Sequence, residues 1–429
     1  MQDNTLTVTD CRIPGRTEPV DIAVDAGVVT RITPTGATPP VGPVLDAAGA
    51  LATPPYVEPH IHLDTALTAG QPRWNISGTL WEGIERWAER RALLTREDVL
   101  ARAEQVLRWQ VAHGVLHVRS HCDVTDPELT ALHALVELRE RVRDVLDLQI
   151  VAFPQEGIVS CAGGERLMAR AVDAGADVLG AIPHFEDTRE DGVRSLRILF
   201  ELAERHGLLV DVHCDEIDDE QSRFVEVVAT LAHRTGLAGR VTASHTTAMG
   251  SYNGAYSRKL RRIVARSGIH LVCNPMVNLT LQGRFDDYPK RRGLTQVKEM
   301  LAAGVNVAFG HDDVMDPWFP LGTANPIQVA HAGVLAAQLS GQDEMDEAFA
   351  MVTERAARVL NLGERYGLAV GRPADFLLLP ADSPFDVLRR QVRPSHVISR
   401  GRVVAETPAA PTRLTWPNRA PEDVDFTRR

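Results

Sequence analysis

The segment Glu58-Pro-His60-Ile-His62-Leu-Asp64 ends an apolar run and carries two histidines two residues apart. If this run forms a β-strand, its side chains alternate between the two faces, so His60 and His62 point the same way. Two neutral imidazoles in that arrangement form half of a site for a first-row transition metal. The other ligands must come from elsewhere in the chain, which indicates a fold that gathers several strand ends in one place.

The middle of the chain, from about residue 52 to 340, alternates short apolar runs with longer amphipathic ones. Eight runs are typical of strands: the one ending at His60 and His62, and 115–123, 148–154, 178–185, 208–215, 240–245, 270–275 and 305–312. Helical patterns lie between them, at 96–112, 128–145, 195–206 and 219–234. This repetition predicts an α/β fold, a parallel (β/α)8 barrel of TIM type. A doubly wound open sheet is less favoured, because no glycine-rich dinucleotide fingerprint follows the first strand.

Both ends of the chain have a different character from the middle. Residues 5–50 read as short β segments broken by turns, and 374–380 and 397–404 return to that pattern. We therefore predict a small β-sandwich-like domain built from residues 1–51 and 366–429, beside a catalytic barrel formed by residues 52–365. A chain of 429 residues is long enough for both.

Composition excludes several classes of protein. The formal net charge of −11 argues against non-specific binding of DNA or RNA, which needs a basic surface. The N-terminus is polar and lacks a secretory signal, and no stretch approaches the roughly 18 apolar residues of a membrane span. The five cysteines are scattered and form no Cys-x-x-Cys pair, which indicates reduced thiols. We expect a cytoplasmic protein with no membrane or nucleic-acid partner.

Polar residues suited to catalysis recur where the predicted strands end, which in TIM barrels is the end that holds the active site. His-x-His alone is equally typical of core or surface histidines, but its combination with further candidates at matching strand ends favours a metal centre. A set of three histidines and one aspartate suits zinc or ferrous iron. Run 178–185 lacks a lysine that could bridge two ions after carboxylation, so we expect one metal. The candidates are His60, His62, Gln155, His213, His245 and Asp312.

Several residues near these ends suit proton transfer or substrate binding. Glu216, three residues after His213, lies where a partly desolvated carboxyl could shuttle protons near neutral pH. The Gln155 amide offers both donor and acceptor to an amide-like ring edge. Asp313 could shape the pocket, and Trp318 could stack on a flat ring, although a core tryptophan is equally consistent. We read two charged runs, Asp218–Glu220 and Lys290–Arg292, as solvated helix starts.

Longer motifs surround these positions: Pro54-Pro-Tyr-Val-Glu-Pro-His-Ile-His-Leu-Asp64, Ala152-Phe-Pro-Gln-Glu-Gly157, Val212-His-Cys-Asp-Glu-Ile-Asp-Asp-Glu-Gln221 and Phe309-Gly-His-Asp-Asp-Val314. Together they resemble the amidohydrolase superfamily and, more narrowly, the bacterial cytosine deaminases. The likeness runs from about residue 50 to past 330. His-x-His is shared by many members of the superfamily, whereas the second and third motifs are much narrower.

The resemblance implies hydrolytic deamination of free cytosine to uracil and ammonia, in pyrimidine salvage, with 5-fluorocytosine as a further substrate. It implies a homo-oligomer with one divalent metal per chain, ferrous iron preferred and zinc as a substitute. Two positions depart from the family pattern, Thr280 in place of a larger histidine and Trp81 in place of phenylalanine, and both could change the pocket size. The roles implied are metal binding for His60, His62, His213 and Asp312, contact with the pyrimidine edge for Gln155, proton transfer at ring N3 for Glu216, and activation of water for His245 together with Asp312.

Three other functions remain open. A deaminase of the same fold could act on creatinine, isocytosine or a triazine. A cyclic-amide hydrolase such as dihydroorotase would open a ring without releasing ammonia, and an inactive barrel could serve as a binding subunit. The small zinc deaminases that edit nucleic acids are excluded, because they need a Cys-x-x-Cys pair that this chain lacks.

Overall fold

The computed structural model describes residues 4–424 and 426. The chain divides into two compact units. One consists of Tyr56–Gln110 and His117–Gly363, and the other of the chain up to Pro55, Val111–Leu116 and the chain from Glu364 onward.

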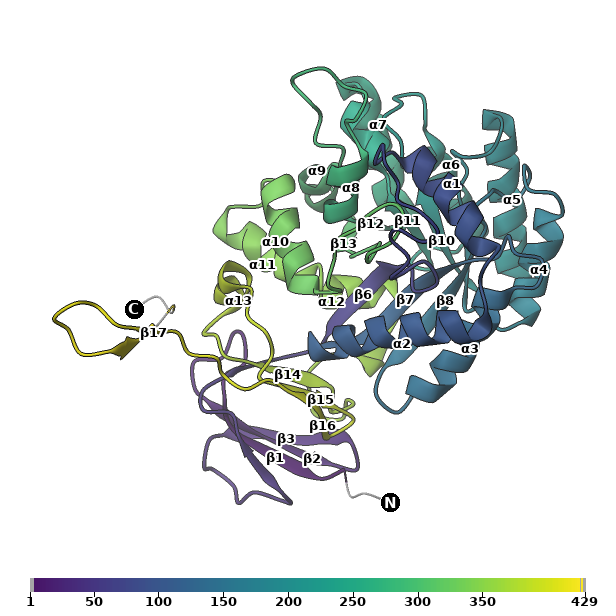
Figure 1. The fold of residues 1–429 in the computed structure, drawn as a ribbon. Helices are drawn as coiled ribbons and strands as arrows, with labels where there is room; N and C mark the ends of the chain where they lie inside the picture. The colour runs from purple at the N-terminus through teal and green to yellow at the C-terminus, as the bar shows by residue number, and fades with distance from the viewer. Residues whose placement is uncertain (1–3, 425, 427–429) are drawn as a thin grey trace. The chain divides into compact units, whose positions relative to one another are not determined.

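The larger unit contains an eight-stranded sheet in which strands adjacent in sequence are adjacent in space (Figure 1). A parallel bridge between Ile61 and Asp312 joins the first strand to the last and closes the barrel. The predicted (β/α)8 fold is confirmed. Several strands end earlier than predicted, because the polar residues at their carboxyl ends leave the sheet as loops. The strands are β6 (Tyr56–Ile61), β7 (Val115–Asp123), β8 (Asp147–Phe153), β9 (Val178–Ala181), β10 (Leu209–Cys214), β11 (Val241–His245), β12 (His270–Cys273) and β13 (Asn306–Phe309).

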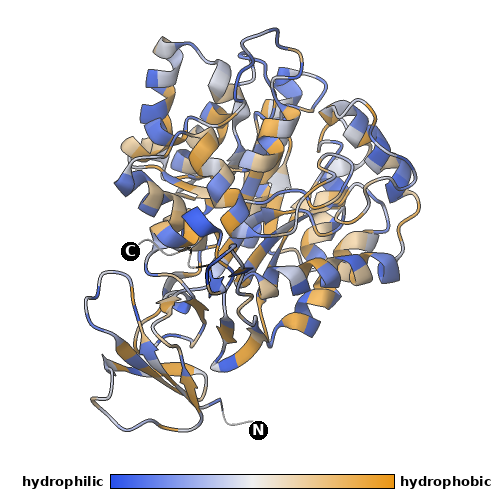
Figure 2. Cartoon of the chain, turned by 60° about the vertical axis from the view of Figure 1, so that its left-hand side comes forward, coloured by the Kyte–Doolittle hydropathy of each residue, from blue (hydrophilic) through white to orange (hydrophobic). Residues whose placement is uncertain are grey.

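Helices follow the strands, and hydrophobic and hydrophilic residues alternate along them (Figure 2). Local sequence sets their ends: α5 begins after Thr188, whose side chain accepts a hydrogen bond from the N–H of Asp191, and ends at Gly207, whose φ is +66°. The helices are α1 (Leu80–Arg91), α2 (Arg96–Ala112), α3 (Thr130–Val142), α4 (Gly164–Asp173), α5 (Arg189–His206), α6 (Phe224–Thr235), α7 (Gly254–Ser267), α8 (Pro275–Leu281), α9 (Val297–Ala302), α10 (Pro326–Ala336), α11 (Gln342–Ala350) and α12 (Glu354–Val359).

Both predicted helix starts built on charged runs are wrong. Asp218–Glu220 lies in the loop between β10 and α6, and α6 begins only at Phe224. Lys290–Arg292 lies in the loop between α8 and α9, where the Arg291 guanidinium pairs with Asp286 at 2.6 Å. Side-chain pairing and carbonyl contacts occupy these charges, so the chain does not need a helix dipole to stabilise them.

The smaller unit holds two four-stranded sheets, with strand orders β3-β2-β1-β4 and β16-β15-β14-β5. Buried apolar residues from both sheets, including Val8, Ile22 and Phe376, form one core. The predicted β-sandwich-like fold built from both termini is confirmed. Its elements are β1 (Leu6–Cys11), β2 (Val20–Asp25), β3 (Val28–Pro34), β4 (Val44–Asp46), β5 (Leu51–Thr53), β14 (Phe376–Leu379), α13 (Pro384–Arg390), β15 (His396–Ser399) and β16 (Arg402–Glu406), with a hairpin of β17 (Arg413–Leu414) and β18 (Glu422–Asp423).

Two expectations from composition concern the whole chain. Over the described residues, no helix is long and apolar enough to cross a membrane. All five cysteines are free thiols, as expected. Cytoplasmic location remains a prediction.

The barrel closes through the residues that were predicted to carry its chemistry. The N–H of Asp312 donates to the carbonyl of His60 at 2.8 Å, and the N–H of His62 donates to the carbonyl of Asp312 at 3.2 Å. The Glu58 carboxylate, 2% exposed, accepts from the N–H groups of His60 and His311, both at 3.0 Å. One buried side chain therefore bonds to the backbones of the β6 and β13 segments at the seam.

We expect Glu58→Ala to lower the free energy of unfolding by about 2–4 kcal/mol, because two buried N–H groups lose their acceptor. Urea denaturation followed by circular dichroism measures this loss. Glu58→Gln keeps a carbonyl acceptor and should cost distinctly less. Equal stability of the alanine variant and the unmodified chain would show that the seam does not depend on Glu58.

Candidate active site

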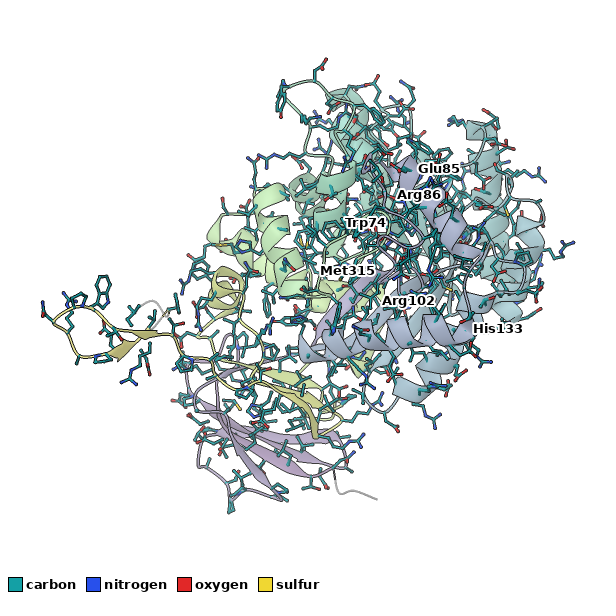
Figure 3. The ribbon with its side chains drawn as sticks, in the orientation of Figure 1. Trp74, Glu85, Arg86, Arg102, His133 and Met315 are labelled. Atoms are coloured by element: carbon teal, nitrogen blue, oxygen red, sulfur yellow. The ribbon has the colours of Figure 1, made fainter. Side chains whose placement is uncertain are left out.

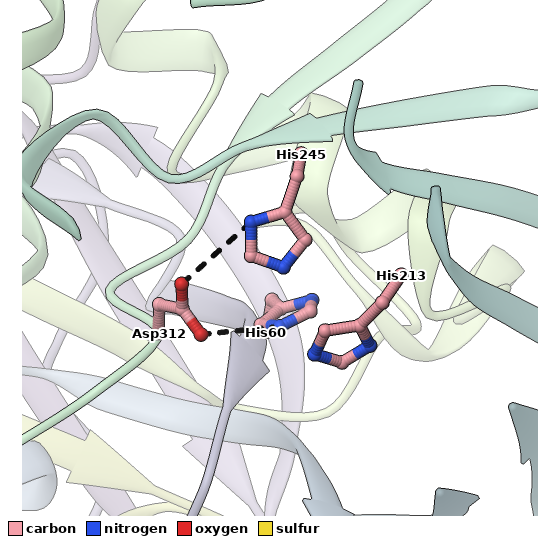
Figure 4. Close-up of side chains that lie close together, drawn as sticks. All are labelled: His60, His213, His245 and Asp312. Atoms are coloured by element: carbon pink, nitrogen blue, oxygen red, sulfur yellow. Dashed lines mark ion pairs between the residues drawn. The ribbon is translucent and has the colours of Figure 1, made fainter. Parts of the chain in front are cut away.

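Four predicted residues meet at the carboxyl ends of the strands (Figure 4). One potential ligand atom from each of His60, His213, His245 and Asp312 lies within 4.8 Å of the others. His60 Nε2 is 3.3 Å from Asp312 Oδ1, and His245 Nδ1 is 3.8 Å from Asp312 Oδ2. His62 belongs to the same group, since its Nε2 lies 3.1 Å from His213 Nε2 and 3.5 Å from Asp312 Oδ1.

Burial keeps these imidazoles neutral. Desolvation lowers the pKa of His60 to about 4, and it lowers the pKa values of His62, His213 and His245 well below the usual value. A neutral imidazole is the form that binds a metal, because its ring nitrogen then has a free lone pair. The histidines of the site therefore need no deprotonation to bind a metal at neutral pH.

The donor atoms fit a divalent metal. Both ring nitrogens of His60, Nδ1 of His213 and Nε2 of His245 are buried without a hydrogen-bond partner. Burial raises the pKa of Asp312, so its ionised form needs a nearby positive charge. The Nε2 atoms of His60, His62 and His213 lie close to one another and to Asp312, so a divalent cation could bind them and offset the burial of the carboxylate. Three histidines with one aspartate suit zinc or iron.

His245 differs from the other histidines in its contacts. Its Nδ1 lies 3.1 Å from the amide nitrogen of Asn278 and 3.2 Å from Glu216 Oε1. This placement suits proton transfer between side chains, so we keep His60, His62, His213 and Asp312 as the proposed ligands. His245 and Asp312 also have φ values of +68° and +70°. Such strained backbone in residues other than glycine is typical of functional sites.

A cavity of about 340 Å³ opens beside the cluster. Its apolar wall comes from Leu80, Phe153, Ile182 and Leu281. Among the described residues, the cavity is lined by Leu281 and Leu80, which are the sequence neighbours of Thr280 and Trp81. The expectation that Thr280 and Trp81 change its size is not supported. Among the predicted residues, those that line it are His62, Gln155, His213, Glu216, His245, Asp312, Asp313 and Trp318.

Trp318 is fixed at the wall of this cavity. Its indole N–H donates to the carbonyl of Leu80 at 3.2 Å, and its backbone N–H donates to Asp316 Oδ1 at 3.0 Å. A side chain on Gly83 would meet the indole at 2.3 Å, so glycine allows α1 to approach it. With its N–H occupied, the indole can offer a ring face but no further donor.

Hydrogen bonds with residues of α2 and β7 hold the loop after His62. Arg102, labelled on α2 in Figure 3, donates to the carbonyls of Asp64 and Ala66 at 2.8 and 2.6 Å. Asp64 Oδ2 accepts from the N–H of Asp123 at 2.8 Å. These bonds fix the path of the chain on the side of the site away from the β6–β13 seam.

Sequence reasoning missed His121 and Asn278. The His121 ring is fully buried on β7, with its centroid 3.9 Å from that of His60. A usable signal was the alternation His117-x-Arg119-x-His121-x-Asp123, which places four polar residues on one face of the strand. Asn278 stands one helical turn after Asn274 on α8, and both amides face His245.

Comparison with known families matches residues 43–405 to one described as "Amidohydrolase family". This chain belongs to the amidohydrolase family. The structure resembles that of the 5-methylcytosine deaminase from Klebsiella pneumoniae liganded with 5-fluorocytosine, at a TM-score of 0.92 and 48% identity over 94% of this chain and 98% of the other.

Among curated relatives, a pterin deaminase from Rhizobium rhizogenes is 30% identical over 90% of this chain and 87% of its own length. An N-isopropylammelide isopropyl amidohydrolase from a Pseudomonas species is 28% identical over 84% of this chain and 88% of its own. The resemblance to the amidohydrolase superfamily and its cytosine deaminases is confirmed, and this amidohydrolase is an enzyme that acts on C–N bonds.

We expect His60→Ala and His213→Ala to weaken metal binding at least ~100-fold, since loss of an outer partner alone typically costs about 10–100-fold. Competition with a chromogenic chelator after loading with Zn²⁺ or Fe²⁺ measures this affinity. His233→Ala, exposed on α6, is the matched control and should bind like the unmodified chain. Unchanged affinity in the His60 and His213 variants would contradict the assignment of this cluster as the metal centre.

Proposed function

We propose that this amidohydrolase deaminates free cytosine, and cytosine with a small substituent such as 5-fluorocytosine, to the corresponding uracil and ammonia. The observation that carries the proposal is the position of Glu216. It is 5% exposed, lies 3.2 Å from His245 Nδ1, and lines the same cavity as Gln155 and Trp318. The 48% identity to a 5-methylcytosine deaminase supports a cytosine-type ring as the substrate.

The cavity suits a small, flat ring without negative charge. Gln155 offers a donor and an acceptor, as the N–C=O edge of a pyrimidine requires. Phe153 and Trp318 supply aromatic surface, and Phe153 stacks on the His213 ring at 4.0 Å between centroids. Glu216, Asp312 and Asp313 are carboxyls in the same lining, and among the described lining residues no lysine or arginine could balance the charge of an anionic substrate.

Glu216 is suited to donate a proton. Burial, and then the Asp312 charge, raise the pKa of Glu216 well above its usual value, which favours its protonated form. A proton given to ring N3 leaves C4 electron-poor and open to attack by water. Asp312 and His245, which face one another, hold the proton released by the attacking water. The bond between C4 and the amino nitrogen breaks when this proton reaches the amine, which leaves as ammonia. Loss of the C4 hydroxyl proton to Glu216 then gives the uracil carbonyl and restores the carboxylic acid.

A divalent metal held by His60, His62, His213 and Asp312 would lower the pKa of water from about 15.7 towards 7 and so supply the nucleophile at neutral pH. We propose one such ion per chain, with Fe²⁺ preferred and Zn²⁺ as a substitute. The barrel of residues 52–365 is the proposed catalytic domain. A homo-oligomer, a cytoplasmic location and a role in pyrimidine salvage complete the proposal.

A deaminase of a related ring is the second candidate. The pterin deaminase and the N-isopropylammelide hydrolase match most of this chain and act on larger or more substituted rings. Their identities of 30% and 28% are well below the 48% of the 5-methylcytosine deaminase. Ring-opening hydrolysis is less favoured, because the proteins matched at 30% and 48% identity are named as deaminases.

We expect metal-loaded protein to release ammonia from cytosine faster than from creatinine, isocytosine or pterin. Glu216→Gln should lower kcat about 10²–10⁴-fold, the usual range for loss of a general acid, while one metal per chain is kept. An enzyme-coupled ammonia assay measures the rate. Glu220→Gln, an exposed change four residues away, is the control and should retain the full rate.

Two results would count against the proposal. Preference for another ring would move the substrate and leave the role of Glu216 in place. Absence of ammonia from every ring, with one metal bound per chain, would contradict deamination itself.

A further inference from the structure

Gln155 sits in a tight turn at the end of β8. The N–H of Gly157 donates to the carbonyl of Pro154 at 2.9 Å, so Gln155 and Glu156 are the central residues of the turn. Gly157 has a φ of +84°, which favours glycine at this position. The direction of the Gln155 side chain therefore depends on what holds this short turn.

The chain directly after the turn bonds to one carboxylate from the next loop of the barrel. Glu186 Oε1 accepts from the N–H of Ile158 at 2.7 Å, and its Oε2 accepts from the N–H of Ser160 at 2.7 Å. The N–H of Val159 lies 3.2 Å from both oxygens. Three consecutive N–H groups that converge on one anion form a backbone nest, and each bond to the charged acceptor is stronger than a neutral one.

This carboxylate is buried and has no cationic side chain as a partner. Glu186 is 7% exposed, and in the described part of the chain no lysine or arginine pairs with it. The N–H groups of Ile158, Val159 and Ser160 therefore balance its charge. A buried charge satisfied only by backbone donors restrains those donors closely, because displacing them would leave the carboxylate unsolvated.

Glu186 also contacts the turn itself. A Cβ added to Gly157 would lie 2.6 Å from Glu186 Oε2, so the carboxylate packs directly on the turn two residues after Gln155. On the other side of the turn, Glu156 pairs with Arg91, which also holds Asp123 at 3.1 Å. The turn is thus held by its contact with Glu186 and by the pairing of Glu156 with Arg91.

We propose that Glu186 is a positioning residue for substrate recognition, which acts by orienting the Gln155 turn toward the bound ring. The part that concerns the ring rests on the proposed function of Gln155. Glu186 lies in the loop after β9 and acts through its contacts with the turn and with the residues that follow it. Its effect should therefore fall on substrate binding, which Gln155 serves, more than on the chemical step, which Glu216 and His245 serve.

Glu186→Gln tests this, because the amide NH₂ would face backbone N–H groups in place of an oxygen. We expect KM for cytosine to rise on the order of tenfold, the cost of one charge-assisted hydrogen bond, with kcat changed less than about twofold. Asp187→Asn removes a neighbouring exposed charge and is the matched control. A fall in kcat on the order of tenfold, with KM unchanged, would overturn the proposal.

A double-mutant cycle separates action through Gln155 from general loosening. In the Gln155→Ala background, Glu186→Gln should raise KM less than about twofold, because the side chain it orients is gone. If the KM increases of the two single variants multiply in the double variant, the proposal is overturned. If Glu186→Gln does not fold, Glu186→Asp keeps the charge on a shorter arm and should show a smaller shift of the same kind.

Hydrogen exchange gives a readout that does not depend on the reaction. Glu186→Gln should speed exchange of the Gln155–Ser160 amides at least about tenfold, and Asp187→Asn should not. If cytosine is not turned over, the proposed function fails while this measurement still decides whether Glu186 holds the turn. Faster exchange confined to Ile158–Ser160, with Gly157 unchanged, would show that the carboxylate anchors the loop without positioning Gln155.

Discussion

The closure of the barrel between β6 and β13 is the constraint on which the site depends. The backbone bonds that close it run between His60, His62 and Asp312, so the last step in forming the sheet also brings three proposed ligands together. Glu58 bonds to both segments from within. Formation of the sheet therefore sets the backbone positions of these ligands. Their side-chain rotamers then complete the geometry of the site.

Burial at this seam has a chemical consequence. The imidazoles lose their water and stay neutral, while the carboxyls of Glu216, Asp312 and Asp313 hold protons more tightly. A divalent cation would favour ionisation of Asp312, its proposed carboxylate ligand.

The sequence predicted the barrel and the position of its site because both depend on short-range patterns. Alternation within β6 places His60 and His62, and the β/α repeat places the other strand ends at the same mouth. The predicted runs 178–185 and 305–312 extend beyond the observed strand ends at Ala181 and Phe309, because the residues that follow belong to loops although they continue the sequence pattern of the strand.

Contacts between distant segments explain what was missed. His121 belongs to the site because β7 lies beside β6 in the sheet, which no local pattern around His121 reveals. Lys290–Arg292 resembled a helix start, but the partners of Arg291 and Arg292 lie on other segments, at Ser251 and at the end of α10. Trp81 and Thr280 were expected to change the size of the pocket, but the residues that line it are their sequence neighbours Leu80 and Leu281.

The site draws on two kinds of support, and this bears on how related enzymes differ. The proposed ligands stand at or just after strand ends, where backbone bonds across the β6–β13 seam fix His60, His62 and Asp312, whereas Gln155 and Trp318 stand in loops held by single carboxylates and caps. A change in a loop can alter the ring that is recognised without moving a ligand. Relatives named for a pterin, an ammelide derivative and a methylated cytosine fit this division, because they share a family while their substrates differ. We therefore expect differences in substrate between members of this family to arise in the loops more than at the strand ends.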